Sequence, residues 1–148
     1  MASGTVTLHR VIKCSTEKLF RAFIVPDAIA SWIPPYGFTC NVEFMDVKIG
    51  GSFRMSFTNF TTGHSHAFGG QYLEIEPARK LVYTDTFDDP NLPGQMMTTV
   101  TLKAVACGTS LDIQQTGIPS MIPVEMCYLG WQESLAKLAA LVEPEIND

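Results

Sequence analysis

Apolar and polar residues alternate at the start of the chain and then give way to a helical spacing. Across residues 5–13 the alternation predicts a first strand. Ser15 or Thr16 can cap the helix that follows. Its apolar positions recur at Leu19, Phe20, Phe23 and Ile24. Pro26 ends this helix and can begin a second short one, which extends through residues 29–32.

From residue 38 onward the pattern has period two, which predicts about six further strands joined as antiparallel hairpins. We expect them at residues 42–47, 53–57, 67–76, 81–87, 97–105 and 109–117. Gly69 and Gly70 interrupt the third of these segments, which indicates a bulge or a sharp bend. A strongly curved sheet requires such a bend.

The longest predicted helix follows these strands and ends at Pro144. Its apolar residues step by four and three positions and form one stripe of Val124, Tyr128, Trp131, Leu135, Leu138 and Val142. The element order therefore predicts an α+β fold in which a curved antiparallel sheet of about seven strands wraps around the C-terminal helix. Such a wrap leaves space between sheet and helix unless every inward side chain is large.

Composition narrows the classes of protein to which the chain can belong. The 148 residues fit one domain, 1–148, and 46% hydrophobic against 17% charged residues excludes a disordered chain. No apolar run is long enough to span a membrane and no secretory signal is visible, so we expect a cytoplasmic protein. The net charge is −5 and the basic residues are scattered, which argues against nucleic acid as a partner.

Motifs for metal binding or nucleophilic catalysis are weak or absent. Cys14, Cys40, Cys107 and Cys127 lack the C-x-x-C spacing, so we expect free thiols. His64 and His66 can start a zinc site only with a third ligand from elsewhere, and they occupy a predicted hairpin tip. Neither a phosphate loop nor a G-x-S-x-G elbow occurs. We therefore assign no catalytic residue, metal or cofactor.

Aromatic residues and methionines on the inward faces are candidates to line a ligand cavity, because such cavities are mostly apolar. They are Trp32, Phe38, Phe53, Met55, Phe57, Tyr72, Tyr83, Phe87, Met97, Tyr128 and Trp131. For any one of these residues a place in the solid core is the favoured interpretation, whereas the set as a whole, given the fold, favours an internal cavity.

Polar residues in phase with apolar faces are more informative, because an unpaired buried polar group is costly. These are Asp85, Gln115, Arg10 and, one residue from the helical stripe, Glu125. One interpretation places some of them in a cavity, where they orient a ligand or act as acid or base. The other is a structural Arg10–Asp85 pair, or strand-end residues that bend out to solvent.

Four segments in this order resemble the activator of heat-shock protein 90 ATPase homologue family, within the START-like helix-grip superfamily. Residues 19–32 read L-F-R-A-F-I-V-P-D-A-I-A-S-W, and residues 46–53 read D-V-K-I-G-G-S-F. Residues 70–87 read G-Q-Y-L-E-I-E-P-A-R-K-L-V-Y-T-D-T-F, and residues 130–138 read G-W-Q-E-S-L-A-K-L. The resemblance implies a cavity for a small hydrophobic or amphipathic molecule.

The superfamily includes lipid carriers, hormone receptors, cyclases and co-chaperone domains, so fold does not settle function. Our first hypothesis is a binding protein for a small hydrophobic molecule, with Asp85, Gln115 or Glu125 orienting it. The alternatives are an enzyme of the polyketide cyclase type that uses a cavity carboxylate, and a module that contacts a chaperone ATPase. A chaperone partner is the least expected of these, and a homodimer is compatible with a domain of this size.

Overall fold

The computed structural model describes residues 3–148 and confirms the predicted α+β architecture. In chain order the elements are β1 (Gly4–Ile12), α1 (Thr16–Ile24), α2 (Pro26–Trp32), β2 (Phe38–Met45), β3 (Ser52–Asn59), β4 (Ser65–Glu76), β5 (Lys80–Phe87), β6 (Met96–Val105), β7 (Gly108–Ile118) and α3 (Val124–Val142).

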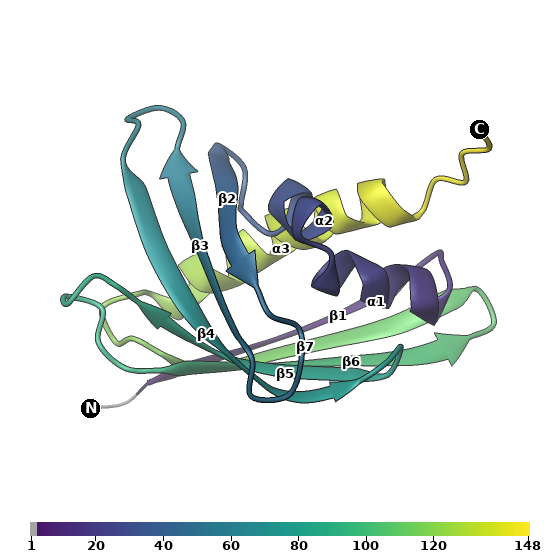
Figure 1. Ribbon diagram of the computed structural model, residues 1–148, viewed down its shortest axis with the longest axis horizontal. Coiled ribbons are helices and arrows are strands. Elements are labelled where there is room, and N and C mark those ends of the chain that lie inside the picture. The colour runs from purple at the N-terminus through teal and green to yellow at the C-terminus, as the bar shows by residue number, and fades with distance from the viewer. Residues whose placement is uncertain (1–2) are drawn as a thin grey trace.

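The strands form one antiparallel sheet in the order β1-β7-β6-β5-β4-β3-β2. Figure 1 shows that this sheet is strongly curved: β2, β3 and the first part of β4 rise steeply from the flatter region of β1 and β5–β7. The helix α3 runs along the concave side and packs against β1, α1 and α2. This is the helix-grip arrangement, in which the sheet encloses the long helix.

The helices α1 and α2 share Val25 as a boundary residue and form a corner over one end of the sheet. Ser15 caps α1, because its hydroxyl accepts a hydrogen bond from the Lys18 amide at 3.1 Å. Trp32 at the end of α2 is completely buried, and its indole N–H donates to the Ala22 carbonyl at 2.9 Å. Its ring meets Phe23 edge-on, with 4.9 Å between centroids. Trp32 therefore joins the two helices.

The backbones of β4 and β5 approach each other closely at Gly70, where the ladder of paired residues between the two strands is interrupted. The ladder pairs Gly69 with Thr86 and then Tyr72 with Tyr83, with no pairing in between. A Cβ atom at Gly70 would lie only 1.8 Å from the Thr84 carbonyl oxygen, so no other residue fits there. The Thr84 hydroxyl instead accepts from the Gln71 amide at 3.0 Å. The register shift between the two strands lies further along, between Tyr72 and Glu74, so the bulge expected at the glycine pair is displaced from it.

The helix α3 departs from the predicted stripe in its first half. Leu135, Leu138 and Val142 are buried as expected, but Val124 and Tyr128 are more than a third exposed. At this end of α3 the face that points toward the sheet is rotated relative to the predicted stripe, and it carries Cys127 and Trp131. A continuous stripe through residues 124 and 128 was therefore wrong for the first two turns.

The packing at Gly70 predicts opposite results for two glycine-to-alanine substitutions. Gly70→Ala should lower the free energy of unfolding by about 1–3 kcal/mol or more, because the added carbon overlaps backbone. Gly130→Ala in α3 has open space around the new carbon and should raise it by up to about 1 kcal/mol. Urea denaturation measures both. A Gly70→Ala protein as stable as wild type would contradict the close approach.

Candidate functional site

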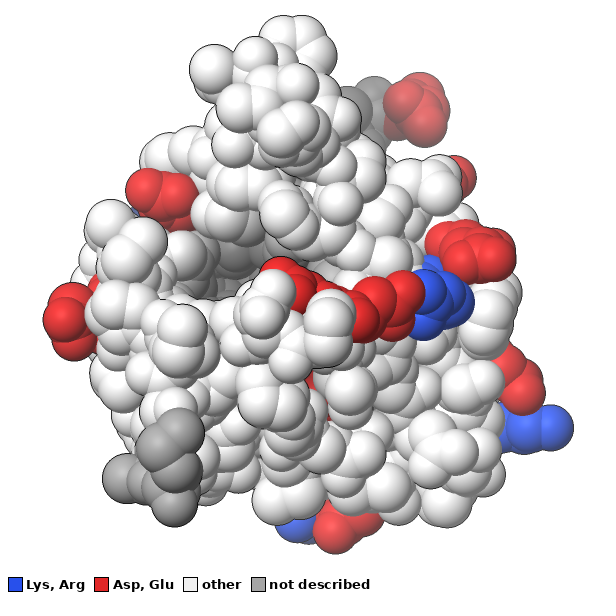
Figure 2. Space-filling model, turned by 90° about the vertical axis from the view of Figure 1, so that its left-hand side faces the viewer, with Lys and Arg blue, Asp and Glu red and all other residues white. Residues whose placement is uncertain are grey.

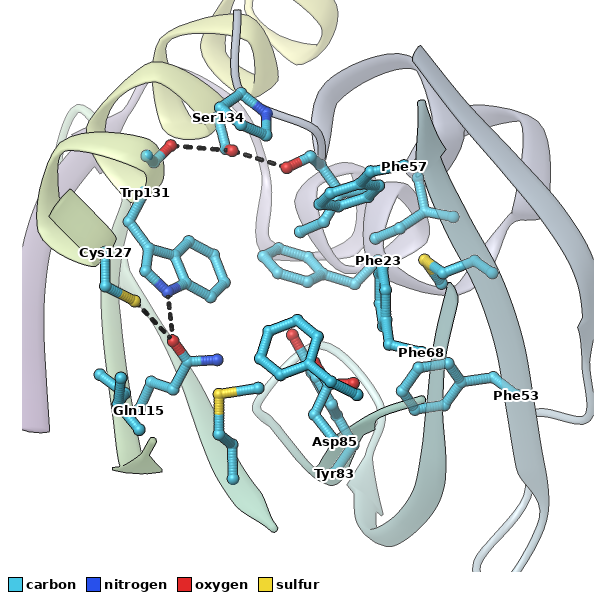
Figure 3. Close-up of a pocket in the computed structure, with 18 of the residues that line it drawn as sticks. Phe23, Phe53, Phe57, Phe68, Tyr83, Asp85, Gln115, Cys127, Trp131 and Ser134 are labelled. Atoms are coloured by element: carbon cyan, nitrogen blue, oxygen red, sulfur yellow. Dashed lines mark hydrogen bonds between the residues drawn. The ribbon is translucent and has the colours of Figure 1, made fainter. Parts of the chain in front are cut away.

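A cavity of about 270 Å³ lies between the curved sheet and α3. Side chains from all three helices and from the strands β2 to β7 line it (Figure 3). Most of the lining is apolar, and its aromatic members are Phe23, Phe53, Phe57, Phe68, Tyr72, Tyr83, Phe87 and Trp131. Several rings meet edge-on, including Phe53 with Tyr83 at 5.7 Å between centroids and Phe57 with Phe68 at 4.8 Å.

Small residues on α3 leave this space open. Cys127, Gly130 and Ser134 line the cavity at helical spacing, with Trp131 among them. Further along, Leu135, Leu138 and Val142 fill the corresponding space against the core. The cavity therefore lies under the first half of α3, and the second half holds the helix in place.

Hydrogen bonds hold α3 at a fixed distance from the sheet and from the segment after α2. The Gln115 side-chain oxygen accepts from the Trp131 indole N–H at 3.0 Å and from the Cys127 thiol at 3.2 Å (Figure 3). The Gln115 amide nitrogen donates to the Thr98 hydroxyl at 3.2 Å. On the other side, the Ser134 hydroxyl lies 2.6 Å from the Ile33 carbonyl oxygen. The amide of Gln115 is thus used within the protein.

Asp85 is the exception among these polar groups. Its Oδ1 is buried without a hydrogen-bond partner, the one such side-chain atom in residues 3–148. Figure 3 shows the side chain at the cavity between the strands, close to Tyr83. Burial raises the pKa of Asp85 to about 8. Among the described residues that line the cavity there is no Lys, Arg or His to compensate its charge.

The remaining titratable groups of the lining are held in their neutral forms. Burial raises the pKa of Tyr72 to about 12. Burial also raises the pKa of Tyr83, and the neighbouring Asp85 adds to this effect. The pKa of the Cys127 thiol is raised by burial as well. The cavity therefore combines neutral polar groups with one carboxyl group that changes its charge near neutral pH.

A second, outer hollow adjoins the cavity, since Phe57, Phe87 and Ile122 line both. Asp88 and Asp89 also line it. On this side of the molecule Figure 2 shows a hollow with acidic side chains along its rim.

A charged pair holds part of this rim. Arg54 donates two hydrogen bonds to the Asp88 carboxylate, and Glu43 lies 3.4 Å from the guanidinium. The hydrogen bond from Arg54 lowers the pKa of Asp88.

The structure brings together a large part of the predicted set. The predicted residues that line the cavity are Phe53, Met55, Phe57, Tyr72, Tyr83, Asp85, Phe87, Gln115 and Trp131. Three of them, Tyr83, Asp85 and Phe87, come from one face of β5, and Leu81 on the same face also lines the cavity.

Five predicted residues lie elsewhere. Trp32 packs behind Phe23, and Phe38 lines the outer hollow. Met97 is 41% exposed because it faces away from α3, and its neighbour Met96 lines the cavity instead. Glu125 and Tyr128 are exposed on the outer side of α3.

The Arg10–Asp85 pair considered from the sequence is wrong. The Arg10 guanidinium donates to the carbonyl of the adjacent His9 at 2.9 Å. Asp85 has no partner at Oδ1. The two side chains share an inward phase on their strands, but β1 is at the edge of the sheet and two strands separate it from β5.

Several lining residues were missed, although the chain carries signals for some of them. Met96 is in phase with the buried Val100 and Leu102, so the alternation in β6 was the available signal. Phe68 is in phase with Tyr72 along β4. The small residues Cys127, Gly130 and Ser134 recur at helical spacing, which indicates a helix face that leaves room. No comparable signal pointed to Ile122.

The fold and cavity define the class: a START-like, helix-grip protein in which a curved sheet holds a long helix over an apolar hollow. The family model for "Activator of Hsp90 ATPase homolog 1-like protein" matches residues 13–143, so the chain belongs to that family. No curated protein matches the chain. In the described part of the chain, no helix has the length and apolar character that crossing a membrane requires.

Solved structures agree with this assignment. Protein CV1439 from Chromobacterium violaceum is 53% identical, with a TM-score of 0.94 over 95% of this chain and 98% of that one. The AHSA1-like protein from Aeromonas hydrophila is 18% identical, with a TM-score of 0.76 over 98% and 99% of the two chains. Protein NE0264 from Nitrosomonas europaea is 19% identical, with a TM-score of 0.80 over 94% of each chain. The last two likenesses show the fold alone.

The surroundings of Asp85 predict how stability depends on pH. An aspartate has a pKa near 3.9 in the unfolded chain, and burial raises that of Asp85 to about 8. Between these values the folded chain binds more protons, so its free energy of unfolding falls as pH rises from about 4 to about 8. Asp85→Asn should remove this decline and be more stable than wild type at pH 8, by about 1 kcal/mol or more.

Urea denaturation across this pH range gives the comparison. Asp88→Asn is the control, because Arg54 lowers the pKa of Asp88 and its contribution is lost only at the acidic end. If the free energy of unfolding changed with pH equally in wild type and Asp85→Asn between pH 4 and 8, the prediction would be contradicted.

Proposed function

We propose that this protein binds a small hydrophobic or amphipathic molecule in the cavity between the sheet and α3. The observation that carries this proposal is an apolar cavity with one unpaired carboxyl group facing it. Ligand cavities are typically apolar with a few polar groups that fix orientation. The aromatic rings would supply affinity through buried apolar area, and Asp85 would orient the polar end of the ligand.

The size of the cavity limits the ligand. Its volume of about 270 Å³ lies near the lower end of the ~300–1,000 Å³ typical of ligand cavities. A compact ring system or a short chain suits this volume better than a membrane lipid with two acyl chains. Ile122, just before α3, lines both hollows, so movement of this segment would give a ligand access.

An enzyme that uses Asp85 as an acid or base is the second candidate. It is favoured by one observation: burial places the pKa of Asp85 at about 8, where a carboxyl group can take up and release a proton near neutral pH. The substrate would be an aromatic or polyketide-like molecule that fits the same cavity. The binding function comes first, because no second carboxyl, amine or imidazole group of the described residues lines the cavity, and burial keeps Tyr72, Tyr83 and Cys127 neutral.

Cellular location and partners follow as further proposals. All four cysteines are free, which suits the reducing cytoplasm. The exposed Met126 at the start of α3 lines the cavity, so we assign the exposed apolar residues there to its rim rather than to a chaperone contact.

Two neighbouring methionines provide a matched test of binding. Met96→Trp adds volume inside the cavity, whereas Met97→Trp adds the same volume on the outer face. In thermal shift and native mass spectrometry with a library of lipids and aromatic compounds, wild type and Met97→Trp should bind the same members. Met96→Trp should bind them at least tenfold more weakly. Equal binding by the two variants, or no binding by wild type, would overturn the proposal.

The enzymatic candidate has its own test in Asp85→Asn, which keeps the size of the side chain and removes its acid–base function. If Asp85 is the acid or base, any turnover found in a screen of aromatic and polyketide-like substrates should fall by about 10²-fold or more. Circular dichroism confirms that the variant is folded. Wild-type turnover by Asp85→Asn would exclude this mechanism.

A further inference from the structure

We propose that the cavity selects small apolar molecules that carry an amine, whose ammonium group pairs with Asp85. This inference rests on the proposed binding function and names its ligand class. Oδ1 of Asp85 is buried with no hydrogen-bond partner, whereas the polar groups of Gln115 and Ser134 are hydrogen-bonded within the protein. An ammonium group supplies both the missing donor and the opposite charge.

The charges around the cavity favour a cation over an anion. Among the described residues of the lining, Asp85 is the one group that ionises as an acid near neutral pH, and no basic side chain accompanies it. Asp88 and Asp89 add negative charge at the outer hollow, although Arg54 is paired with Asp88. The acidic rim in Figure 2 would attract cations and repel carboxylates on their way in.

The aromatic rings beside Asp85 also suit an ammonium group. Tyr83 and Phe87 flank Asp85 on the same face of β5, and Phe53 packs edge-on against Tyr83. A cation next to the carboxylate would lie near these rings, and the faces of aromatic rings attract cations. The apolar part of the ligand would then extend toward α3, where Trp131 and Cys127 line the other wall.

Ligand binding would change the protonation state of Asp85. Below its pKa of about 8 the empty cavity holds a neutral carboxylic acid. When an ammonium ion binds, Asp85 loses its proton to solvent and the ion pair forms. Binding at pH 6 should therefore release close to one proton per ligand and be weaker than binding at pH 8.5, where much of Asp85 is already ionised.

The other titratable groups near Asp85 do not produce this pH dependence. Tyr72 on β4, Tyr83 on β5 and Cys127 on α3 line the cavity, and burial raises the pKa of each. They remain largely neutral from pH 6 to 8.5. His66 lines the outer hollow and is exposed. A variant that lacks only the Asp85 carboxylate separates the effect of Asp85 on the pH dependence of binding from any effect of His66.

The test compares octylamine, octanol and octanoate, which share one chain and differ in the polar group. Isothermal titration at pH 8.5 should show octylamine binding at least tenfold more tightly than octanol, with octanoate weakest. From pH 6 to 8.5 the affinity for octylamine should rise at least tenfold, because Asp85 becomes ionised over this range while the amine stays protonated. Titration in buffers of different ionisation enthalpy measures the released proton.

Asp85→Asn is the decisive variant. It should bind octylamine no better than octanol, release no proton, and keep its affinity for octanol within a few-fold. If wild type binds octanol and octylamine equally, the amine proposal is overturned while the binding function stands. If neither these probes nor the matching phenylbutyl compounds bind at millimolar concentration, the binding function itself fails.

Discussion

The close contact of the β4 and β5 backbones at Gly70 is the constraint on which the rest of the structure depends. Because Gly70 has no side chain, the Thr84 carbonyl can approach it, and the ladder between the two strands is interrupted there. The steep part of the sheet meets the flat part in this region (Figure 1). This curvature forms the concave side along which α3 lies, and Asp85 follows Thr84 directly on β5.

Much of the fold could be predicted because regular alternation survives in most strands and helical spacing survives in the helices. The face of β5 is an example, since Leu81, Tyr83, Asp85 and Phe87 keep strict period two. The site could be predicted only in part, since a cavity depends on how two surfaces meet. Met96 and Met97 are neighbours on β6 and point to opposite faces of the sheet, so a shift of one residue in the expected alternation selected Met97 instead of Met96. On α3, the rotated contact face brings Cys127 rather than Tyr128 to the cavity. Neither is determined by local spacing alone.

Asp85 illustrates how a site can oppose stability. A buried carboxyl group without a donor costs free energy in the empty protein, and the fold offers it neither a basic side chain nor a hydrogen-bond donor at Oδ1. Gln115 shows the opposite case, because its amide is bonded to Trp131, Cys127 and Thr98 and fixes α3 on β7. Two polar residues on inward faces thus differ: Gln115 is bonded within the protein, whereas Asp85 is the group that we propose a ligand contacts.

The division of α3 into a half with small residues and a half that fills the core has an evolutionary consequence. Changes at Cys127, Gly130 or Ser134 alter the shape of the hollow, whereas Leu135, Leu138 and Val142 maintain the attachment of the helix. Proteins that share this framework can therefore differ in the shape of the hollow while the attachment of α3 is kept. The 19% identity and TM-score of 0.80 shared with NE0264 show that this fold is kept in a chain of largely different sequence.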